Sequence, residues 1–278
     1  MGQKLGQHFL KNKKILYAIA EAVELRANET IIEIGPGHGE LTNELLNLKV
    51  KSLKVILIEK DKILAEQLKK KFGKDKNIKI VCGDALKVLP RIVSSLTPSP
   101  YSLVPIYKIV GNIPYYITGH LFRIIQELKK RPIRIIVMIQ KEVALRMVKK
   151  PPEMNLLAAS VQYWADPKII MSVSKKEFSP QPKIDSAVIE LCTKDTHLKN
   201  NGKEEERYYK TLGILFKQPR KTIKNNITLF YRSANGCNIQ EKEKTFEKLE
   251  KEGVKIEKRP QNLDIKEIEK ISTIICQK

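Results

Sequence analysis

Residues 111–116, Gly-Asn-Ile-Pro-Tyr-Tyr, place an amide, a proline and two tyrosines directly after a short apolar segment. The side-chain carbonyl of Asn112 and a backbone carbonyl at Ile113 or Pro114 are two acceptors that can converge on one exocyclic amine. The ring of Tyr115 offers a face on which a base can stack, worth roughly 1–3 kcal/mol per base. Because the lone pair of an aromatic amine is delocalised, acceptors that raise its electron density favour methyl transfer to it. An ordinary loop is the alternative interpretation.

A glycine-rich turn, Glu33-Ile-Gly-Pro-Gly-His-Gly39, follows an earlier apolar segment. Gly35 and Gly37 allow a ligand to approach the backbone where a Cβ atom would block it. The spacing is G-x-G-x-G, whereas the dinucleotide fingerprint is G-x-G-x-x-G. The turn alone is weak evidence, but it favours S-adenosylmethionine, which has no pyrophosphate for a helix amino terminus to bind, over a nicotinamide dinucleotide.

Two acidic residues follow the next two apolar segments. Glu59 is placed to accept hydrogen bonds from both hydroxyls of a ribose, and Asp84, in C-G-D-A-L, from an adenine amine. An acid after a strand is also a common helix N-cap, so either acid alone has two interpretations. Ligands of open parallel sheets bind beyond the carboxyl ends of the strands, where all of these residues fall. Three such features in chain order predict a nucleotide-like cofactor.

These residues require a sheet that brings the ends of several strands together. Short apolar segments that alternate with helical patterns predict a parallel sheet covered on both faces by helices. The expected strands are residues 30–34, 54–58, 78–81, 106–110 and 134–139, with further strands at 169–173 and 186–191 and helices at 15–25, from about residue 40, and at 63–72.

Beyond the last expected strand the pattern is helical, which predicts two domains. The first, residues 1–193, carries the motifs above; a polar linker at 194–206 and a helical domain at 207–278 follow. The Pro/Ser-rich segment 94–105 is expected to be a surface loop.

The charge of the chain favours an anionic partner. The 278 residues carry a formal net charge of +21, with 42% hydrophobic residues, as in a soluble globular protein. A polyanion such as RNA is therefore the first partner to consider and an anionic membrane surface the second, although lysine-rich coding bias also contributes. Residues 207–240 contain seven Lys and Arg and no acid, and residues 129–150 contain eight and one Glu. These two segments are the candidate phosphate-binding surfaces.

The four cysteines are scattered without a C-x-x-C pair, which argues against a zinc site and a disulfide framework. The amino-terminal residues lack an apolar signal region, and the longest apolar run, Ile135 to Ile139, is too short to span a bilayer. We therefore expect a cytoplasmic protein.

The motifs together resemble the small-subunit ribosomal RNA adenine dimethyltransferase family, and N-I-P-Y resembles the N/D-P-P-Y/F motif of adenine amino-methyltransferases. The resemblance extends over nearly the whole chain. Its motifs are G-Q-H-F-L (6–10), E-I-G-P-G-H-G-E-L-T (33–42), I-E-K-D (58–61), G-D-A-L (83–86), G-N-I-P-Y (111–115), F-S-P-Q-P-K-I-D-S-A-V (178–188), Q-P-R-K-T-I-K-N-N-I (218–227) and R-P-Q-N-L (259–263).

The resemblance implies an α/β fold: a Rossmann-like class I S-adenosylmethionine-dependent methyltransferase sheet followed by a small all-helical C-terminal domain that binds RNA. It implies dimethylation of the exocyclic amines of two adjacent adenosines in a hairpin near the 3′ end of small-subunit rRNA, during ribosome biogenesis. The implied cofactor is S-adenosylmethionine, without a metal. The implied partner is small-subunit rRNA within an assembling small ribosomal subunit, without a membrane.

Site residues follow from the resemblance where the chain matches the motifs. Those expected to bind the cofactor are His8, Leu10, Gly35, Gly37, Glu59, Asp84, Ala85 and Asn112. Those expected to act on the target base are Asn112, Pro114, Tyr115 and Phe178. Phe178 would close the face of the base opposite Tyr115; without the resemblance it would be taken as a core aromatic residue.

The target base lies in structured RNA and must be unstacked to reach such a pocket. The residues expected to bind the RNA backbone are Arg146, Lys149, Lys150, Arg220, Lys221 and Lys224. Any single lysine is more often a solvated surface residue, so only their clustering supports this role.

Three other functions compete with this interpretation. A related large-subunit rRNA methyltransferase that confers antibiotic resistance shares N-I-P-Y, but P-K-I-D-S-A-V and R-K-T-I-K-N-N-I resemble the small-subunit enzymes more. A non-catalytic nucleic-acid-binding or assembly factor on the same fold, such as a mitochondrial transcription factor, is disfavoured by the intact acids and N-I-P-Y. A nicotinamide oxidoreductase comes last because of the glycine spacing.

Overall fold

The computed structural model describes residues 8–96, 106–198, 202–233 and 239–276. Most of the expected surface loop at 94–105, the first two residues of the 6–10 motif and part of the expected linker lie outside these residues. By their internal contacts the residues form two compact units, 1–145 with 165–200, and 146–164 with 201–278.

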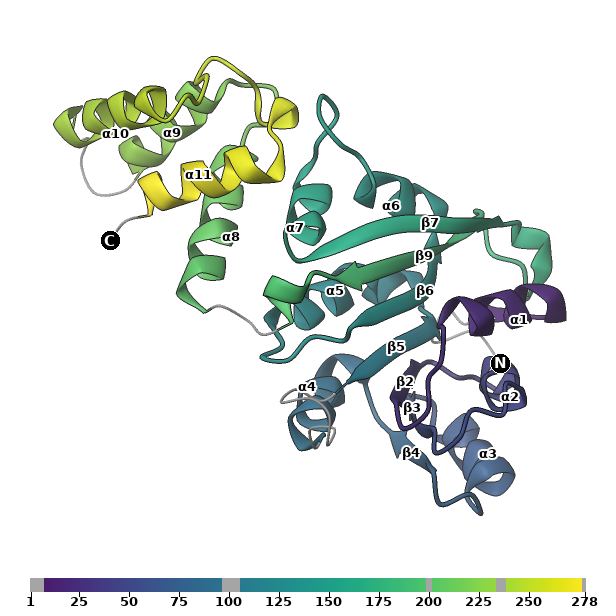
Figure 1. Ribbon diagram of the computed structural model, residues 1–278. Helices are drawn as coiled ribbons and strands as arrows, with labels where there is room; N and C mark the ends of the chain where they lie inside the picture. Colours follow the sequence, from purple (N-terminus) through teal and green to yellow (C-terminus); the bar gives the residue numbers. More distant parts are fainter. Residues whose placement is uncertain (1–7, 97–105, 199–201, 234–238, 277–278) are drawn as a thin grey trace. The chain divides into compact units, whose positions relative to one another are not determined.

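A seven-stranded sheet with the strand order β4-β3-β2-β5-β6-β9-β7 forms the centre of the first unit (Figure 1). The strands are β2 (Thr30–Ile34), β3 (Lys54–Glu59), β4 (Ile78–Cys82), β5 (Tyr107–Asn112), β6 (Arg134–Gln140), β7 (Ala165–Val173) and β9 (Ser186–Thr193). Strands β2 to β6 are parallel, which confirms the five that the sequence predicts. The two further strands also exist, but β9 runs antiparallel to both β6 and β7, so the sheet is mixed rather than wholly parallel.

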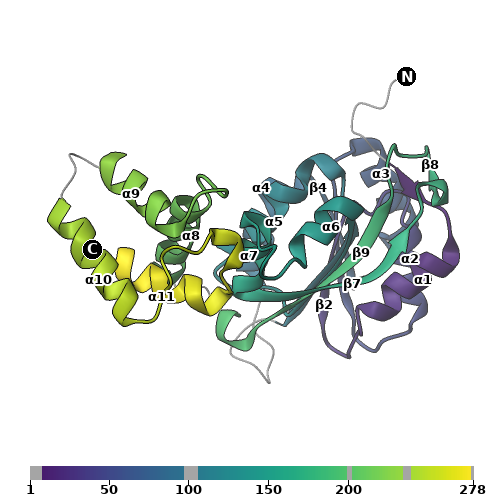
Figure 2. The same ribbon diagram turned by 90° about the horizontal axis from the view of Figure 1, so that it is seen from above.

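Helices cover both faces of this sheet, as predicted. They are α1 (Lys13–Ala22), α2 (Glu40–Asn47), α3 (Lys62–Phe72), α4 (Ala85–Ser95), α5 (Thr118–Glu127) and α6 (Lys141–Met147). In Figures 1 and 2, α5 and α6 lie on the opposite side of the sheet from α1 and α2. The side chains of Asn12 and Asp61 cap the amino ends of α1 and α3 by accepting backbone N–H bonds, which explains where these two helices begin.

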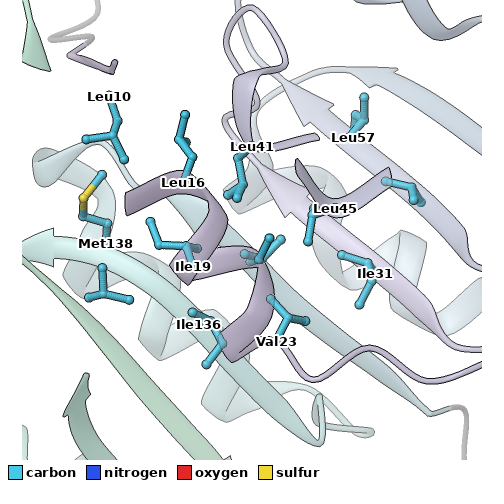
Figure 3. Packing of buried hydrophobic residues seen from close by; sticks show 14 of the residues in the cluster. Leu10, Leu16, Ile19, Val23, Ile31, Leu41, Leu45, Leu57, Ile136 and Met138 are labelled. Carbon is cyan, nitrogen blue, oxygen red and sulfur yellow. The ribbon is translucent and has the colours of Figure 1, made fainter. Parts of the chain in front are cut away.

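An apolar cluster joins α1 and α2 to the sheet (Figure 3). Its members include Leu16 and Ile19 of α1, Leu41 and Leu45 of α2, and Ile136 and Met138 of β6. Each such side chain stabilises the fold by about 1.5–3 kcal/mol when it is fully buried. The cluster therefore holds the first two helices rigidly against the strands whose ends carry the motifs.

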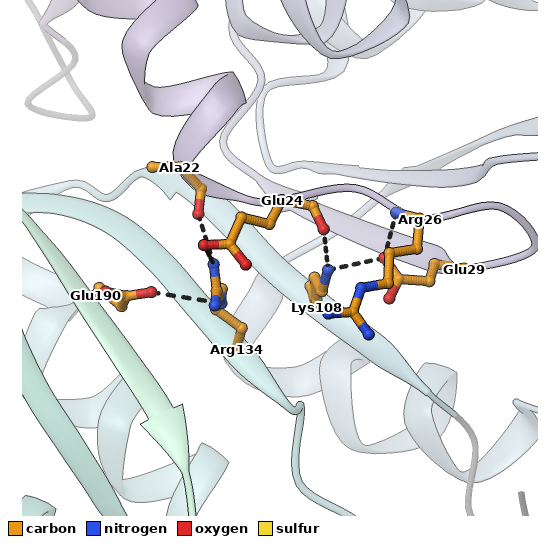
Figure 4. Close-up of polar contacts among 7 residues, drawn as sticks. All are labelled: Ala22, Glu24, Arg26, Glu29, Lys108, Arg134 and Glu190. Carbon is orange, nitrogen blue, oxygen red and sulfur yellow. Dashed lines mark hydrogen bonds and ion pairs between the residues drawn. The ribbon is translucent and has the colours of Figure 1, made fainter. Parts of the chain in front are cut away.

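A network of charges built around one buried ion pair lies at the other end of the same strands (Figure 4). Glu29, just before β2, pairs with Lys108 of β5 at 2.8 Å, and these side chains are only 7% and 4% exposed. The Lys108 ammonium also donates to the backbone carbonyl of Glu24 at 2.6 Å. Beside it, Arg134 of β6 pairs with the carboxylates of Glu24 and Glu190 at 2.7 and 3.4 Å. The amino-terminal ends of β2, β5 and β6 are thereby tied together.

The second unit consists of helices in its described part: α7 (Leu156–Trp164), α8 (Lys203–Leu215), α9 (Ile223–Ser233), α10 (Ile239–Lys251) and α11 (Ile265–Ile275). The ring of Tyr163 on α7 stacks on Tyr208 of α8 with 3.8 Å between centroids, and the Tyr208 hydroxyl donates to the carbonyl of Ala159 at 3.0 Å. The helical character agrees with the sequence pattern. The grouping differs from the linear division at residue 193, because residues 146–164 precede β7 in the chain and yet belong to this unit.

Candidate active site

A pocket opens at the carboxyl ends of the parallel strands β2 to β5, where ligands of such sheets bind. Its empty volume, open mouth included, is about 800 Å³, which suits a nucleoside-sized ligand. The lining includes nine of the residues predicted for the site: His8, Gly35, Gly37, Glu59, Asp84, Ala85, Asn112, Pro114 and Tyr115. The fold therefore brings together residues that lie as far as 107 positions apart, His8 and Tyr115.

The glycine turn after β2 closes against the neighbouring elements. Gly35 and Gly37 have φ values of +68° and +61°, in the left-handed region that favours glycine. A Cβ atom on Gly37 would lie 2.9 Å from the ring of Phe9, and one on Gly35 would lie 3.4 Å from the backbone oxygen of Asn112. Both glycines are therefore favoured by the backbone of the turn, and Gly37 is also needed for its close approach to the amino-terminal segment, whereas a Cβ atom on Gly35 would make only an ordinary contact with β5.

Glu59, the last residue of β3, is held by the backbone on both of its oxygens. Oε2 accepts the N–H of Gly37 at 3.1 Å, and Oε1 accepts the N–H of Asp61 at 2.9 Å. Burial raises the pKa of Glu59, and these backbone donors oppose that shift. Each carboxylate oxygen still has a second lone pair, so the group can accept from a pair of vicinal hydroxyls. This arrangement fits the predicted contact with a ribose.

Asp84 combines the two roles that the sequence left open. Its Oδ1 accepts the N–H of Leu86 at 3.0 Å and caps α4, while Oδ2 pairs with the ammonium of Lys60 at 2.9 Å. Burial by itself raises the pKa of Asp84, but Lys60 and the Leu86 N–H together lower it below its ordinary value. The carboxylate stays ionised and keeps lone pairs for an amine. Lys60 also lines the pocket and was not predicted, because a lysine after a strand carries no signal of its own.

Asn112, at the end of β5, is fixed in one orientation. Its Nδ2 donates to the backbone carbonyl of His8 at 2.8 Å. Because a carbonyl can only accept, the amide nitrogen must face His8 and Oδ1 must face away from it. No described residue donates to Oδ1, which leaves it available as an acceptor. The carbonyl of Pro114 accepts only the N–H of Ile117 at 3.1 Å among the bonds shown by the described residues, and so keeps a second lone pair.

Tyr115 begins a short 3-10 turn, η1 (Tyr115–Ile117), and its hydroxyl lies 2.7 Å from Oγ of Ser186 on β9. Burial raises the pKa of Tyr115, so its hydroxyl remains neutral near pH 7. The ring lies 6.1 Å from that of His8, at 30° between the planes. Ser186 thus anchors the far end of the ring, and its place in the K-I-D-S-A-V motif is the sequence signal that could have identified this support.

Two motifs that are far apart in the chain pair next to the pocket. The short strands β1 (Phe9–Leu10) and β8 (Phe178–Ser179) are antiparallel, with Leu10 opposite Phe178. Nδ1 of His8 donates to the carbonyl of Pro180 at 2.8 Å and extends this pairing. The pairing positions the His8 carbonyl that Asn112 uses.

Leu10 and Phe178 differ from the other predicted residues. They are 4% and 5% exposed and belong to the hydrophobic cluster of the first unit, and neither is among the residues that line the pocket. As packed here, their side chains contact the core.

The six residues predicted to bind RNA all belong to the second unit, and they differ in their partners. Lys149 pairs with Glu153 at 2.5 Å and Lys224 with Glu257 at 3.2 Å. Arg146, Lys150, Arg220 and Lys221 are exposed, and no described carboxylate pairs with them. These four cations are the better candidates for phosphate contacts.

Among the described residues, no cluster of three or more His, Cys, Asp and Glu side chains is arranged to hold a metal ion. None of the described helices has the length and apolar character that crossing a membrane requires.

Comparisons with known proteins find relatives over nearly the whole chain. A model of the family described as ribosomal RNA adenine dimethylase matches residues 2–272. The chain is 33% identical over 270 residues to the ribosomal RNA small subunit methyltransferase A of Moorella thermoacetica, covering 96% of this chain and 90% of that protein.

Two solved structures also match this chain over nearly its whole length. A dimethyladenosine transferase from Plasmodium falciparum superposes with a TM-score of 0.76 at 26% identity, covering 95% of both chains. The 23S rRNA methyltransferase ErmE superposes with a TM-score of 0.68 at 24% identity, covering 97% of this chain and 100% of that one. The second similarity shows a shared fold.

Proposed function

The chain belongs to the ribosomal RNA adenine dimethylase family, and from this premise we propose that it dimethylates two adjacent adenosines in a hairpin near the 3′ end of small-subunit rRNA. As a member of the family it is an S-adenosylmethionine-dependent rRNA adenine dimethyltransferase with the class I methyltransferase fold. The observation that carries the proposal is the fixed orientation of Asn112, whose Oδ1 is left as an acceptor beside the ring of Tyr115.

We assign the cofactor to the half of the pocket between β2 and β4. Glu59 accepts from the ribose hydroxyls, Asp84 accepts from the adenine amine, and Ala85 packs beside the adenine. Gly35 and Gly37 allow the ligand to approach the backbone, and His8 borders it. When bound, S-adenosylmethionine supplies an electrophilic methyl group on a sulfonium.

We assign the target adenine to the half of the pocket beside β5. Asn112 Oδ1 and the Pro114 carbonyl each accept a hydrogen bond from one N–H group of the exocyclic amine, which raises the electron density on its nitrogen. Tyr115 stacks on the base, and Ser186 and His8 hold the tyrosine ring in place. Because the methyl donor is a strong electrophile, the amine loses its proton after attack and no strong general base is needed.

Leu10 and Phe178 belong to the same proposal with a condition. Leu10 is assigned to the border of the cofactor and Phe178 to the second face of the base. Both side chains lie in the core. Leu10 lines a smaller cavity together with Gly35 and Asn112, whereas the Phe178 ring must become accessible from the pocket before it can contact a base.

We further propose that the substrate is rRNA in an assembling small subunit in the cytoplasm, bound through the exposed cations of the second unit. The base must leave its stack to reach the acceptors, which costs a few kcal/mol that backbone contacts offset. Small-subunit rRNA is favoured over large-subunit rRNA because the relative at 33% identity carries the small-subunit name, whereas ErmE shares 24%.

The test is transfer of labelled methyl from S-adenosylmethionine to unmethylated small subunits, with large subunits assayed in parallel. We expect label in two adjacent adenosines near the 3′ end of small-subunit rRNA, with two methyls on each. Label in large-subunit rRNA would instead support the resistance-type activity. Cofactor and RNA binding without any label would leave a binding or assembly role.

A further inference from the structure

The turn between α8 and α9, residues 217–222, exposes three cations, Lys217, Arg220 and Lys221. We call this segment the basic turn. No carboxylate pairs with these three cations among the described residues, whereas the nearby Lys224 pairs with Glu257 at 3.2 Å. Their charge is therefore available to an anionic partner.

One buried side chain fixes the backbone of the basic turn. Asn226, on the first turns of α9, is 2% exposed. Its Oδ1 accepts the N–H of Gln218 at 3.0 Å. Its Nδ2 donates to the carbonyls of Gln218 and Thr222, each at 3.1 Å, and lies 3.4 Å from that of Lys221. Because these bonds need a donor and an acceptor on one short side chain, asparagine is the residue type that satisfies them together.

Further hydrogen bonds restrain the backbone of the basic turn. The N–H of Lys221 donates to the carbonyl of Gln218 at 2.9 Å, which places Pro219 at the second position of a β-turn and Arg220 at the third. The Thr222 hydroxyl accepts the N–H of Asn225 at 3.2 Å and starts α9. A fixed backbone reduces the conformational entropy lost when Arg220 and Lys221 bind a ligand.

We propose that Asn226 is a positioning residue for RNA binding, which holds the basic turn so that Arg220 and Lys221 meet the phosphate backbone. Asn226 itself is buried and does not contact RNA. The inference rests on the proposed function, because it takes structured rRNA as the polyanion.

The experiment compares five variants of the full-length protein: Asn226→Ala, Pro219→Gly, the pair R220Q/K221Q, and each of the first two combined with that pair. Asn225→Ala is the matched control, since it removes an exposed asparagine from the adjacent position. Pro219 is exposed, so P219G loosens the turn without removing a buried contact and decides the question if N226A fails to fold. The readouts are binding of the unmethylated small-subunit 3′ hairpin at several salt concentrations and cofactor affinity. In the variants that keep Arg220 and Lys221, the rate of tryptic cleavage after these two residues is measured as well.

We expect R220Q/K221Q to weaken RNA binding about tenfold and to lower the slope of log K against log salt by roughly 1.4–1.8, about 0.7–0.9 per phosphate contact. N226A should weaken binding about fivefold and P219G about threefold, with faster cleavage, while N225A stays within about twofold of wild type. In the R220Q/K221Q background both changes should have little further effect, because coupled residues are not additive. Cofactor affinity should not change.

Equal effects of N226A or P219G with and without R220Q/K221Q would overturn the proposal, since they would act independently of the two cations. Unchanged RNA binding by R220Q/K221Q would also overturn it, because there would be no contact to position. Neither result depends on methyl transfer, so a failure of the proposed activity is detected separately by the labelling assay.

Discussion

At the scale of single residues, the site depends on groups whose orientation is fixed by backbone atoms. The His8 carbonyl sets which end of the Asn112 amide faces the pocket, and two backbone N–H groups set the plane of the Glu59 carboxylate. Such preorganisation lowers the reorganisation needed when a ligand binds. It also means that small chemical changes at these positions have specific effects.

Glu59→Gln tests the ribose assignment. An amide in this place can accept from only one of the Gly37 and Asp61 N–H groups and must turn its own N–H₂ toward the other, so the glycine turn is disturbed. We expect the Kd for S-adenosylmethionine to rise at least about tenfold, equal to ~1.4 kcal/mol, by calorimetry. Glu66→Gln on the exposed side of α3 is the control and should leave the Kd unchanged. An unaltered Kd in E59Q would refute the assignment.

Glu33 makes the stability of the protein depend on pH. It is buried on β2, accepts the Thr42 hydroxyl at 2.7 Å, and burial raises its pKa from 4.5 to about 8. The folded protein therefore keeps a proton that the unfolded chain releases above pH 4.5. Its stabilising effect is complete below that pH and is lost as the pH rises through about 8.

Glu33→Gln should remove this dependence. Between pH 5.5 and 7.5 we expect wild type to lose up to about 2–3 kcal/mol of unfolding free energy relative to E33Q, because each pH unit in the window contributes at most ~1.4 kcal/mol. Urea unfolding at several pH values measures the difference, with Glu66→Gln as an exposed control. Parallel curves for wild type and E33Q would contradict it.

At the scale of elements, opposite ends of the same strands have different roles. The carboxyl ends of β2 to β5 carry the pocket, and the amino ends of β2, β5 and β6 carry the charge network with its buried Glu29–Lys108 pair (Figure 4). Stability and chemistry can therefore be changed separately.

Glu29→Ala should destabilise the protein without altering the pocket. It leaves the Lys108 ammonium buried without its carboxylate, a loss of about 3–5 kcal/mol by urea unfolding. Replacing both partners, Glu29→Leu with Lys108→Met, should recover most of that loss. The exposed pair of Lys69 and Glu66 is the control, and breaking it should have little effect on stability because solvent screens the two charges. If E29A lowered the unfolding free energy as little as the control does, the buried pair would not stabilise the fold.

The sequence predicts the seven strands of the sheet because each is a short apolar run between turn signals. It does not predict the direction of β9, since a strand pattern carries no information about the direction of its partner. Nor does it predict β1 and β8, whose two residues each are too few for a period. The pairing that positions His8 is therefore visible only in the structure.

At the scale of the whole molecule, the two compact units are not continuous segments of the chain. The chain leaves the first unit at residue 146, within α6, contributes α7 to the helical unit, and returns to the first unit as β7. The sequence predicts the boundary at the polar linker, because composition marks only the second crossing between the units. The Tyr163–Tyr208 stack shows how α7 is joined to its unit.

The net charge of +21 indicates a polyanionic partner but does not identify the residues that bind it. Structure separates the predicted cations into those with an acidic neighbour, Lys149 and Lys224, and those without one in the described part of the chain. The sequence alone could not make this distinction, because it does not show which acidic side chain lies beside which lysine.

The account as a whole depends on Asn112 acting on the target amine. Asn112→Ala removes the positioned acceptor but leaves Glu59 and Asp84 in place for the cofactor. The most direct measurement is methyl transfer to small subunits at saturating cofactor, together with the Kd for S-adenosylmethionine, in wild type, N112A and the exposed control Asn77→Ala. We predict that N112A turnover falls about 10²-fold or more, in the range seen when one preorganised polar group is removed, while the Kd changes less than about fivefold. Near wild-type turnover in N112A would contradict the account.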